Sequence, residues 1–309
     1  MSLFKKSKLL YELYNFFQYS KLKKNVPFYK ELGLNKKFYS SISNRDFNGL
    51  DASFFKPKQN EVDSINAEFE KLSRSFKEQV ESFEDDGFAI IKSFFTEDKI
   101  KGINDEVERL LSCREARFSY RNKIMFAIHK SGLIKKMGED KVLLTILNYL
   151  LKENTTLFQS INFKTGSNQK THSDAIHMST FPRGKMIAVW VALEDMTIEN
   201  GPLHYYPGSH RLPYVMNEDF GNVGSRFWLG SKSYFDYEDK IQEIIDQNGL
   251  EKKIFLASKG DILIWHANIL HGGEKVIDSE STRKSVVFHY YADRCIAFHE
   301  ITERPTFRE

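Results

Sequence analysis

Cysteine and long apolar runs are both scarce in this sequence. Its 309 residues include only two cysteines, Cys113 and Cys295, which are too few for a disulfide framework and lack CxxC spacing. We therefore expect free thiols and a cytoplasmic protein. No segment approaches the roughly 18 consecutive apolar residues of a membrane-spanning helix. Seven prolines and 17 glycines form no low-complexity segment.

The sequence does have the composition of a packed globular protein. Hydrophobic residues make up 41% of it, with 26 phenylalanines and 14 tyrosines. A chain of this length can bury a large core, and it fits one main domain with an extension. We predict the extension over residues 1–50 and the main domain over residues 51–309.

Positive charge is concentrated at the N-terminal end. Residues 1–37 hold nine lysines and two acidic residues, a balance of +7, which leaves −4 for the remainder of a chain whose net charge is +3. Apolar residues recur here at helical spacing, at Leu9, Leu10, Leu13, Phe16 and Phe17. Lysines flank them, at Lys5, Lys6, Lys8, Lys21, Lys23 and Lys24. Pro27 is expected to end this helix.

Two interpretations of the basic amphipathic segment stay open. Its apolar face can enter an anionic membrane surface while the lysines meet phosphates, or it can bind an acidic partner. Alternatively, the apolar face packs on the main domain. No recognition motif accompanies the charge, so a nucleic-acid partner is not expected.

Helices and then strands are predicted for the rest of the chain. Apolar periodicity indicates one long helix over 61–83, a helix capped by Thr96 that runs toward Leu111, and a helix over 139–151. Short β-rich segments bounded by turn residues lie at 88–91, 158–163, 186–193, 203–206, 261–265 and 285–291. This pattern favours a mainly β fold with flanking helices, whose core is an antiparallel jelly roll, a cupin-like double-stranded β-helix.

Residues 211–258 interrupt the series of strands. They hold many aromatic residues, including Phe227 and Trp228, and a predicted helix from Asp236 to Asn248. A long insertion of this kind is often a lid or a substrate wall. We therefore treat Phe227 and Trp228 as candidate substrate residues, with a purely structural packing role as the alternative.

The motif His172-Ser173-Asp174 carries the main chemical signal. On a β-strand, residues i and i+2 share a face, so the imidazole and the carboxylate can reach one ion. His271, far downstream, would complete a 2-His-1-carboxylate set with open positions for O₂ and a cosubstrate, as in non-haem Fe(II) sites. The same donors also suit a structural or hydrolytic zinc ion.

A 2-oxoacid cosubstrate would need a cation near this metal. Arg283 lies twelve residues after His271, and its guanidinium can hold a carboxylate through two parallel hydrogen bonds. The neighbouring Lys284 should face the opposite side of the strand. A zinc site would leave Arg283 unexplained. Other candidates to orient the cosubstrate lie on the strand before the motif, at Gln159, Asn162 and Lys164. His177 follows the motif closely and is a candidate substrate residue.

Further motifs surround these residues. The His-x-Asp motif precedes a strand with Trp190, the turn Asn200-Gly201-Pro202-Leu203 and the sequence Pro207-Gly208-Ser209-His210. The distal histidine, in His271-Gly272, follows a strand that begins Gly260-Asp261-Ile262-Leu263. In this arrangement the segment from Thr171 to Tyr291 resembles the phytanoyl-CoA dioxygenase family of Fe(II)/2-oxoglutarate-dependent oxygenases. Residues 85–111 match loosely, and the first 50 residues have no counterpart.

The resemblance implies specific roles and a reaction. His172, Asp174 and His271 would hold Fe(II), Arg283 would bind 2-oxoglutarate, and Trp190 would lie beside the cosubstrate. The reaction would use O₂, convert 2-oxoglutarate to succinate and CO₂, and hydroxylate a small-molecule, lipid or glycan-related substrate. Asp174 favours hydroxylation over halogenation, because related halogenases have a small residue there. A non-catalytic jelly-roll protein that binds a ligand or partner through its basic N-terminal helix is the alternative.

Overall fold

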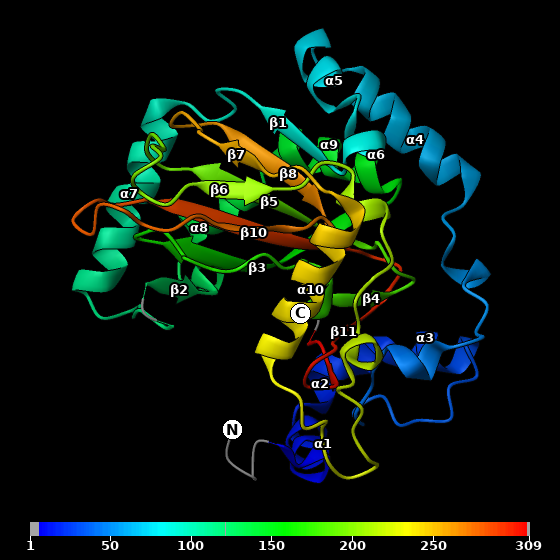
Figure 1. Ribbon diagram of the computed structural model, residues 1–309. Coiled ribbons are helices and arrows are strands. Elements are labelled where there is room, and N and C mark those ends of the chain that lie inside the picture. Colours follow the sequence, from blue (N-terminus) through cyan, green and yellow to red (C-terminus); the bar gives the residue numbers. More distant parts are fainter. Residues whose placement is uncertain (1–5, 121, 308–309) are drawn as a thin grey trace.

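A six-stranded antiparallel sheet is the largest element of the computed structural model, which describes residues 6–120 and 122–307 (Figure 1). The strand order is β1 (Phe88–Ile91), β8 (Ile262–His266), β5 (Met186–Ala192), β10 (Ser285–Ala292), β3 (Thr155–Phe163) and β2 (Lys123–Met125). The β segments predicted for this sheet are confirmed, although β3 begins three residues earlier than expected. Nothing in the sequence had indicated β2.

Side-chain alternation gives this sheet two different apolar faces. On β10, Val286, Phe288 and Tyr290 belong to one core cluster, whereas Val287 and Tyr291 belong to another. Helices cover the first face, at α7 (Glu97–Ser112), α8 (Gly132–Gly138) and α9 (Lys141–Leu151). As predicted, the Thr96 side chain caps α7 by accepting a hydrogen bond from the backbone N–H of Lys99.

Two three-stranded sheets lie against the second face. One has the order β7 (Lys253–Phe255), β6 (Leu203–Tyr205), β9 (His271–Gly273), and the other β12 (Arg304–Pro305), β11 (Ile296–His299), β4 (Ser179–Phe181). Leu203, Phe255 and Ala297 of these sheets share a core cluster with Trp190 and Leu263 of the large sheet. The prediction of antiparallel sheets with flanking helices is confirmed. Closure into a double-stranded β-helix stays a prediction.

The single helix predicted over 61–83 is wrong. The segment forms three helices, α4 (Gln59–Glu70), α5 (Arg74–Val80) and α6 (Phe83–Asp86). The break allows two packing directions, because α4 stacks Phe69 on Tyr149 of α9 at 3.7 Å between ring centroids while α5 lies against β1. One straight helix could not reach both partners. Short 3-10 helices complete the chain, at η2 (Lys23–Asn25), η3 (Asn44–Phe47), η4 (Ser53–Phe55), η5 (Ala127–His129), η6 (Asp174–Ile176), η7 (Ser209–Arg211) and η8 (Asn217–Phe220).

The N-terminal extension is docked on the main domain. It contains α1 (Lys8–Phe17), α2 (Tyr19–Leu22) and α3 (Val26–Glu31), so Pro27 lies in the first turn of a helix and does not end one. Proline is tolerated there because the first N–H groups of a helix have no intrahelical partner. Tyr29 and Ile42 pack with Phe298 of β11 in one core cluster. Residues 1–5, including Lys5, lie outside the described residues.

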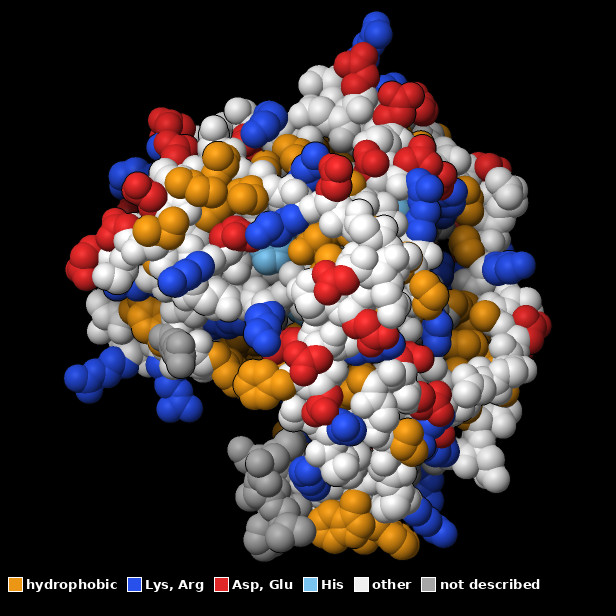
Figure 2. Space-filling view, viewed as in Figure 1, with side chains coloured by type: hydrophobic (Ala, Val, Ile, Leu, Met, Phe, Trp, Pro, Cys, Tyr) orange, Lys and Arg blue, Asp and Glu red, His pale blue; other side chains and the backbone are white. Residues whose placement is uncertain are grey.

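The predicted apolar face of α1 does not pack on the main domain. Leu9, Leu13 and Phe17 are 54%, 56% and 74% exposed, and Leu10 and Phe16 are similar. The alternative in which this face is buried against the domain is therefore wrong. Figure 2 shows apolar side chains at the lower end of the molecule, in the region of α1 and the loop beside it.

The insertion packs against residues that flank the small sheets. Its helix α10 (Tyr234–Asn248) begins two residues before the predicted start, because Ser233 supplies the N-cap, and it buries Tyr237 and Ile241 against Tyr206 and Leu270. As expected, neither Cys113 nor Cys295 forms a disulfide within the described part of the chain. Within the described part of the chain, no helix is long and apolar enough to cross a membrane.

Candidate metal centre and cosubstrate cavity

His172 and His271 face each other across a pair of backbone hydrogen bonds. The N–H of each residue donates to the C=O of the other at 2.9 Å, and their rings lie 4.5 Å apart. The prediction that the motif lies on a regular β-strand is wrong. His172 forms an isolated β-bridge, and Asp174 begins the 3-10 helix η6. The side chains still converge. The ligand atoms of His172, Asp174 and His271 all lie within 4.8 Å of one another.

Both imidazoles present the same nitrogen to the centre of this triad. Nδ1 of His172 lies 2.9 Å from the carbonyl oxygen of Lys170, and Nδ1 of His271 lies 3.1 Å from that of Ile269. A ring that donates its Nδ1–H to a carbonyl keeps the lone pair of Nε2 for a metal. The amide of Gln169 lies 3.0 Å from Nε2 of His172, where it can donate to that lone pair.

The charge states of the triad suit a divalent cation. Burial, together with the neighbouring His271, lowers the pKa of His172 well below its usual value. Burial alone would raise the pKa of Asp174, but the imidazoles of His271, His289 and His172 hold that pKa below its ordinary value. A neutral imidazole and an ionised carboxylate are the forms that bind metals. The donor set therefore fits Fe(II).

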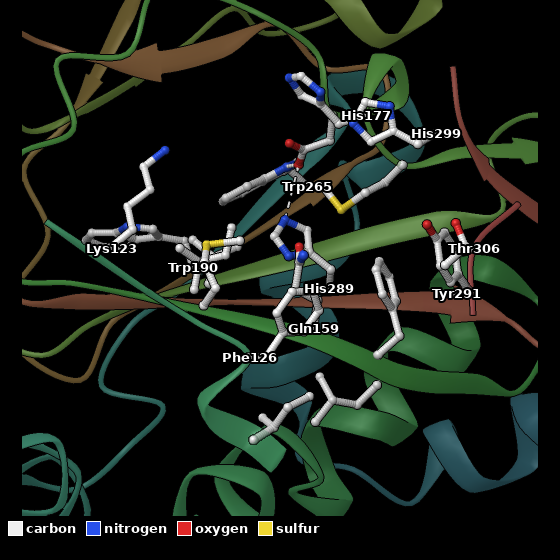
Figure 3. A pocket seen from close by; sticks show the side chains of 18 of the residues that line it. Lys123, Phe126, Gln159, His177, Trp190, Trp265, His289, Tyr291, His299 and Thr306 are labelled. Atoms are coloured by element: carbon white, nitrogen blue, oxygen red, sulfur yellow. Dashed lines mark hydrogen bonds and ion pairs between the residues drawn. The ribbon is translucent and has the colours of Figure 1, made fainter. Parts of the chain in front are cut away.

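A cavity of about 1070 Å³ surrounds the triad. In Figure 3 its labelled residues extend from Lys123 and Trp190 at one end to Tyr291 and Thr306 at the other, with Trp265 and His289 between them. The cavity is larger than a small dicarboxylate requires, so it can hold a second molecule as well. One end is cationic and the other is largely aromatic.

Arg283 supplies the main cation of this cavity. It is 3% exposed, donates to the Ser285 hydroxyl at 3.2 Å, and lies over the rings of Phe163 and Trp190 at 5.3 and 5.9 Å. Its Nε has no hydrogen-bond partner among the described residues. Burial lowers the pKa of Arg283 to about 10, so the guanidinium remains charged at neutral pH. A buried charged guanidinium without a carboxylate partner is unfavourable, and an anionic ligand would compensate its charge.

The structure places some predicted site residues in the cavity and others elsewhere. Gln159, Trp190 and His177 line it together with the triad and Arg283. Asn162 and Lys164 do not; they lie beside α7 on the opposite face, with Lys284. On the part of β3 that follows its register shift, Gln159 and Ile161 line the cavity, and strand alternation therefore turns Asn162 to the other face of the sheet.

Phe227 and Trp228 lie outside the cavity. They are about half exposed, and backbone contacts join their loop to the start of α1, where the N–H of Lys8 donates to the Phe227 carbonyl at 2.9 Å. The described residues of 211–258 support the site from behind; the Tyr237 hydroxyl, for example, accepts a hydrogen bond from the Ser173 N–H at 2.9 Å. These contacts favour the packing role over the lid.

Among the cavity residues that sequence reasoning missed, four lie close to the candidate metal ligands. Lys123 and Gln169 are joined by a 2.9 Å hydrogen bond near His172, and no motif marks either residue. Trp265 and His289 contact Asp174. Trp265 shares a face of its strand with Leu263, and His289 with Val287 and Tyr291, but strand alternation alone does not tell which face meets the cavity.

The 2-His-1-carboxylate triad beside a buried arginine, on antiparallel sheets, defines the chain as a non-haem iron oxygenase. The family model for phytanoyl-CoA dioxygenase (PhyH) matches residues 83–285, and the chain belongs to this family. It is an Fe(II)/2-oxoglutarate-dependent dioxygenase. Its cofactor and cosubstrate are Fe(II) and 2-oxoglutarate.

Several known proteins are similar to this chain over most of its length. Ectoine dioxygenase from Stutzerimonas stutzeri (strain A1501) is 28% identical over 264 residues, which cover 74% of this chain and 82% of that protein. The non-heme alpha ketoglutarate dependent carbocyclase SnoK from nogalamycin biosynthesis has a TM-score of 0.59 at 17% identity, covering 74% and 87% of the two chains. EctD from S. alaskensis, solved with 2-oxoglutarate and 5-hydroxyectoine, has a TM-score of 0.54 at 20% identity, covering 72% and 76%.

Proposed function

We propose that this dioxygenase hydroxylates a small molecule and that Arg283 binds the distal carboxylate of 2-oxoglutarate. The single observation that carries the cosubstrate assignment is the buried guanidinium, which forms no ion pair with a carboxylate of the described residues and lines the same cavity as the triad. When bound by His172, Asp174 and His271, Fe(II) supplies the oxidative chemistry that converts 2-oxoglutarate and O₂ to succinate and CO₂.

The residues around Arg283 would orient the cosubstrate. The rings of Phe163 and Trp190 both lie near the Arg283 guanidinium, and its unpartnered Nε is available for a pair of parallel hydrogen bonds to a carboxylate. Lys123 adds a second cation on the same side. Burial, and then the proximity of Arg283, lower the pKa of Lys123, so an arriving dianion would relieve the repulsion between these two groups. Gln159 lines the cavity between the two ends and is assigned an orienting role.

Hydroxylation is favoured by the carboxylate at position 174. Asp174 occupies the ligand position that halogenases leave open for a halide. The fold neighbours include the carbocyclase SnoK, so we expect substrate placement to decide which product forms on this scaffold. A jelly-roll closure of the three sheets would keep water out of the metal site, and we retain it as part of the proposal.

Succinate formation tests the reaction. Purified protein with Fe(II), ascorbate and 2-oxoglutarate should release succinate, and His172→Ala or Asp174→Ala should abolish the release. Metal binding without turnover of 2-oxoglutarate across a broad substrate panel would contradict the enzyme. That result would favour a zinc site or the non-catalytic binding protein.

The far end of the cavity indicates the class of substrate. Phe158 and Tyr291 stack there at 3.8 Å, and Lys21, Lys24 and Phe28 of the extension also line the cavity. We infer an apolar or sugar-stacking body, which fits a lipid or glycan-related molecule. His177 lies 5.3 Å from His299 between ring centroids, and burial lowers the pKa of His177 to about 3. A neutral imidazole suits hydrogen bonding to an uncharged substrate group.

The exposed apolar face of α1 and the lysines that follow it support contact of residues 1–37 with an anionic membrane. The exposed face of α1 joins Phe227 and Trp228, because Ser7 pairs with Trp228 in an isolated β-bridge. Exposed lysines follow α1, at Lys21, Lys23 and Lys24. Aromatic and leucine side chains beside lysines fit the boundary between headgroups and acyl chains. We propose that this surface binds anionic bilayers and that the cavity draws its substrate from there.

Vesicle sedimentation tests the membrane proposal. The protein should bind vesicles that contain phosphatidylglycerol more strongly than pure phosphatidylcholine vesicles, and Leu13→Glu with Phe17→Glu should remove the binding. Ile277→Glu is the matched control, because Ile277 is 67% exposed and lies outside the extension. Equal binding by all variants would contradict the proposal. So would self-association in solution that Phe17→Glu abolishes, since a second copy would then cover this face.

A further inference from the structure

Asp174 presents its two carboxylate oxygens to different partners. Oδ1 lies 3.9 Å from Nε2 of His172 and 3.8 Å from Nε2 of His271, so it faces the centre of the triad. Oδ2 accepts a hydrogen bond from the indole Nε1–H of Trp265 at 2.8 Å. Nε2 of His289 approaches the same oxygen at 3.7 Å. Only Oδ1 is left for a metal.

Trp265 itself has no freedom to turn away. It lies on β8 and pairs with Phe88 of β1 on one side and Ala188 of β5 on the other. It is 2% exposed, and its ring lies 4.7 Å from that of His271. In Figure 3, Trp265 and His289 lie next to each other in the middle of the cavity. The indole is therefore a rigid donor aimed at one oxygen of Asp174.

We propose that Trp265 is a positioning residue that holds Asp174 as a one-oxygen metal ligand. A carboxylate with a free second oxygen can rotate and bind a cation through both oxygens. Two-oxygen binding would occupy one of the coordination positions that a cosubstrate and O₂ require. The proposal rests on the proposed function, because it concerns how this chain holds that metal.

A phenylalanine at position 265 removes the donor and keeps most of the packing. Trp265→Phe should weaken Mn(II) binding roughly 10- to 100-fold, the usual range for loss of a hydrogen bond to a metal ligand. The Kd is measured by titration, with the EPR signal of free Mn(II) as readout and without 2-oxoglutarate. The absorption spectrum of the Co(II) form should also change, because the number of bound oxygens changes.

Trp190→Phe is the matched control. Trp190 is 1% exposed and lines the same cavity, but its Nε1 has no hydrogen-bond partner among the described residues. In the absence of 2-oxoglutarate, this variant should bind Mn(II) with the Kd of the wild type. Melting temperatures of the metal-free variants separate a general loss of packing from a specific loss of metal affinity.

A second experiment observes the indole of Trp265 itself and therefore does not require that Trp265→Phe folds. The chain has three tryptophans. In ¹⁵N-labelled protein the indole N–H of Trp265 should exchange slowly with solvent, and Asp174→Ala should accelerate this exchange. Wild-type Mn(II) affinity in Trp265→Phe, or unchanged indole exchange in Asp174→Ala, would overturn the proposal. Failure of the wild-type protein to bind Mn(II) or Fe(II) would instead overturn the proposed function.

Discussion

Arg283 is a buried cation whose counterion is expected to be the cosubstrate, and this gives a prediction at the scale of one residue. Arg283→Met should raise the Kd for 2-oxoglutarate by at least about 30-fold, since loss of a buried charge partner costs about 2 kcal/mol or more. The same variant should stabilise the protein in the absence of cosubstrate, because an unpaired buried guanidinium is removed. Calorimetry with Mn(II) present measures the first effect and thermal melting the second.

Lys284→Met is the control for that substitution. Lys284 is the neighbouring residue, but it faces α7, where it approaches Glu108 at 3.8 Å. Its Kd for 2-oxoglutarate should match that of the wild type. An unchanged Kd in Arg283→Met would disprove the assignment of Arg283 to the cosubstrate.

Gly272 has no room for a side chain. A Cβ there would lie 2.7 Å from the carbonyl oxygen of Gln169 and 2.7 Å from the ring of His204. Gly272→Ala should therefore displace His271, weaken Mn(II) binding at least tenfold and lower the free energy of unfolding by about 1–3 kcal/mol. Gly102→Ala, inside α7 with 3.9 Å of clearance, should instead stabilise the protein by about 1 kcal/mol. Denaturant titration measures both, and equal effects would contradict the steric argument.

At the scale of single residues, the three metal ligands and Arg283 could be predicted from the sequence. They occur in recognisable motifs, which are His-x-Asp, a distant His-Gly, and an arginine twelve residues after that histidine. Asn162 was misplaced through neglect of strand alternation. Lys123 could not be found, because its place beside Arg283 depends on β2 pairing with β3, and a three-residue strand has no periodicity. Pairing between distant short segments is decided by tertiary packing.

At the scale of elements, a buried ion pair joins the start of α1 to the main domain. Nζ of Lys8, at the start of α1, lies 2.5 Å from Oε2 of Glu303, and both residues are at most 5% exposed. Lys8→Met leaves a buried carboxylate with less compensation and should lower the free energy of unfolding by roughly 3 kcal/mol. Urea titration measures this change, and limited proteolysis should show earlier cleavage within residues 1–50.

Lys23→Met is the control, because Lys23 is exposed and forms no ion pair with the described residues of the main domain. It should leave the urea midpoint within about 0.5 kcal/mol of the wild type. Proteolysis of Lys8→Met at the wild-type rate would show that the ion pair does not hold the extension.

Elements with a cap or strict periodicity were predicted well from the sequence. The helix after Thr96 and the helix in the insertion both have caps, and their bounds agree closely. The break between α4 and α5 carries no Gly or Pro, so its cause lies in the separate partners of the two helices. Pro27 was misread, because proline also starts helices.

Glu300 links three distant parts of the whole molecule. Its carboxylate accepts hydrogen bonds from the N–H of Asn44 in the extension at 2.8 Å and from the N–H of Asn217 in the insertion at 3.3 Å. Burial, and secondarily the nearby Glu303, raise the pKa of Glu300 to about 7 from 4.5. At pH values between about 4.5 and 7, Glu300 is therefore protonated more often in the folded state than in the unfolded state.

Stability should therefore fall as pH rises through that window. The free energy of unfolding should be largest below about pH 4.5 as far as Glu300 is concerned, and Glu300 should remove up to roughly 3 kcal/mol by pH 8. Glu300→Gln should flatten this dependence, as measured by urea titration from pH 5 to 8. An equal slope in the two proteins would assign the pH dependence to other groups.

The antiparallel pairing of His172 with His271 also has a consequence for the order of events in folding. These residues are 99 positions apart in the chain, and their mutual hydrogen bonds form only when β9 reaches the motif. Closing this loop costs chain entropy before any contact repays it, so we expect the contact to form late in folding. A metal ion bound there should then act mainly on the unfolding rate, so loading the centre should lengthen the lifetime of the native state without hastening its formation.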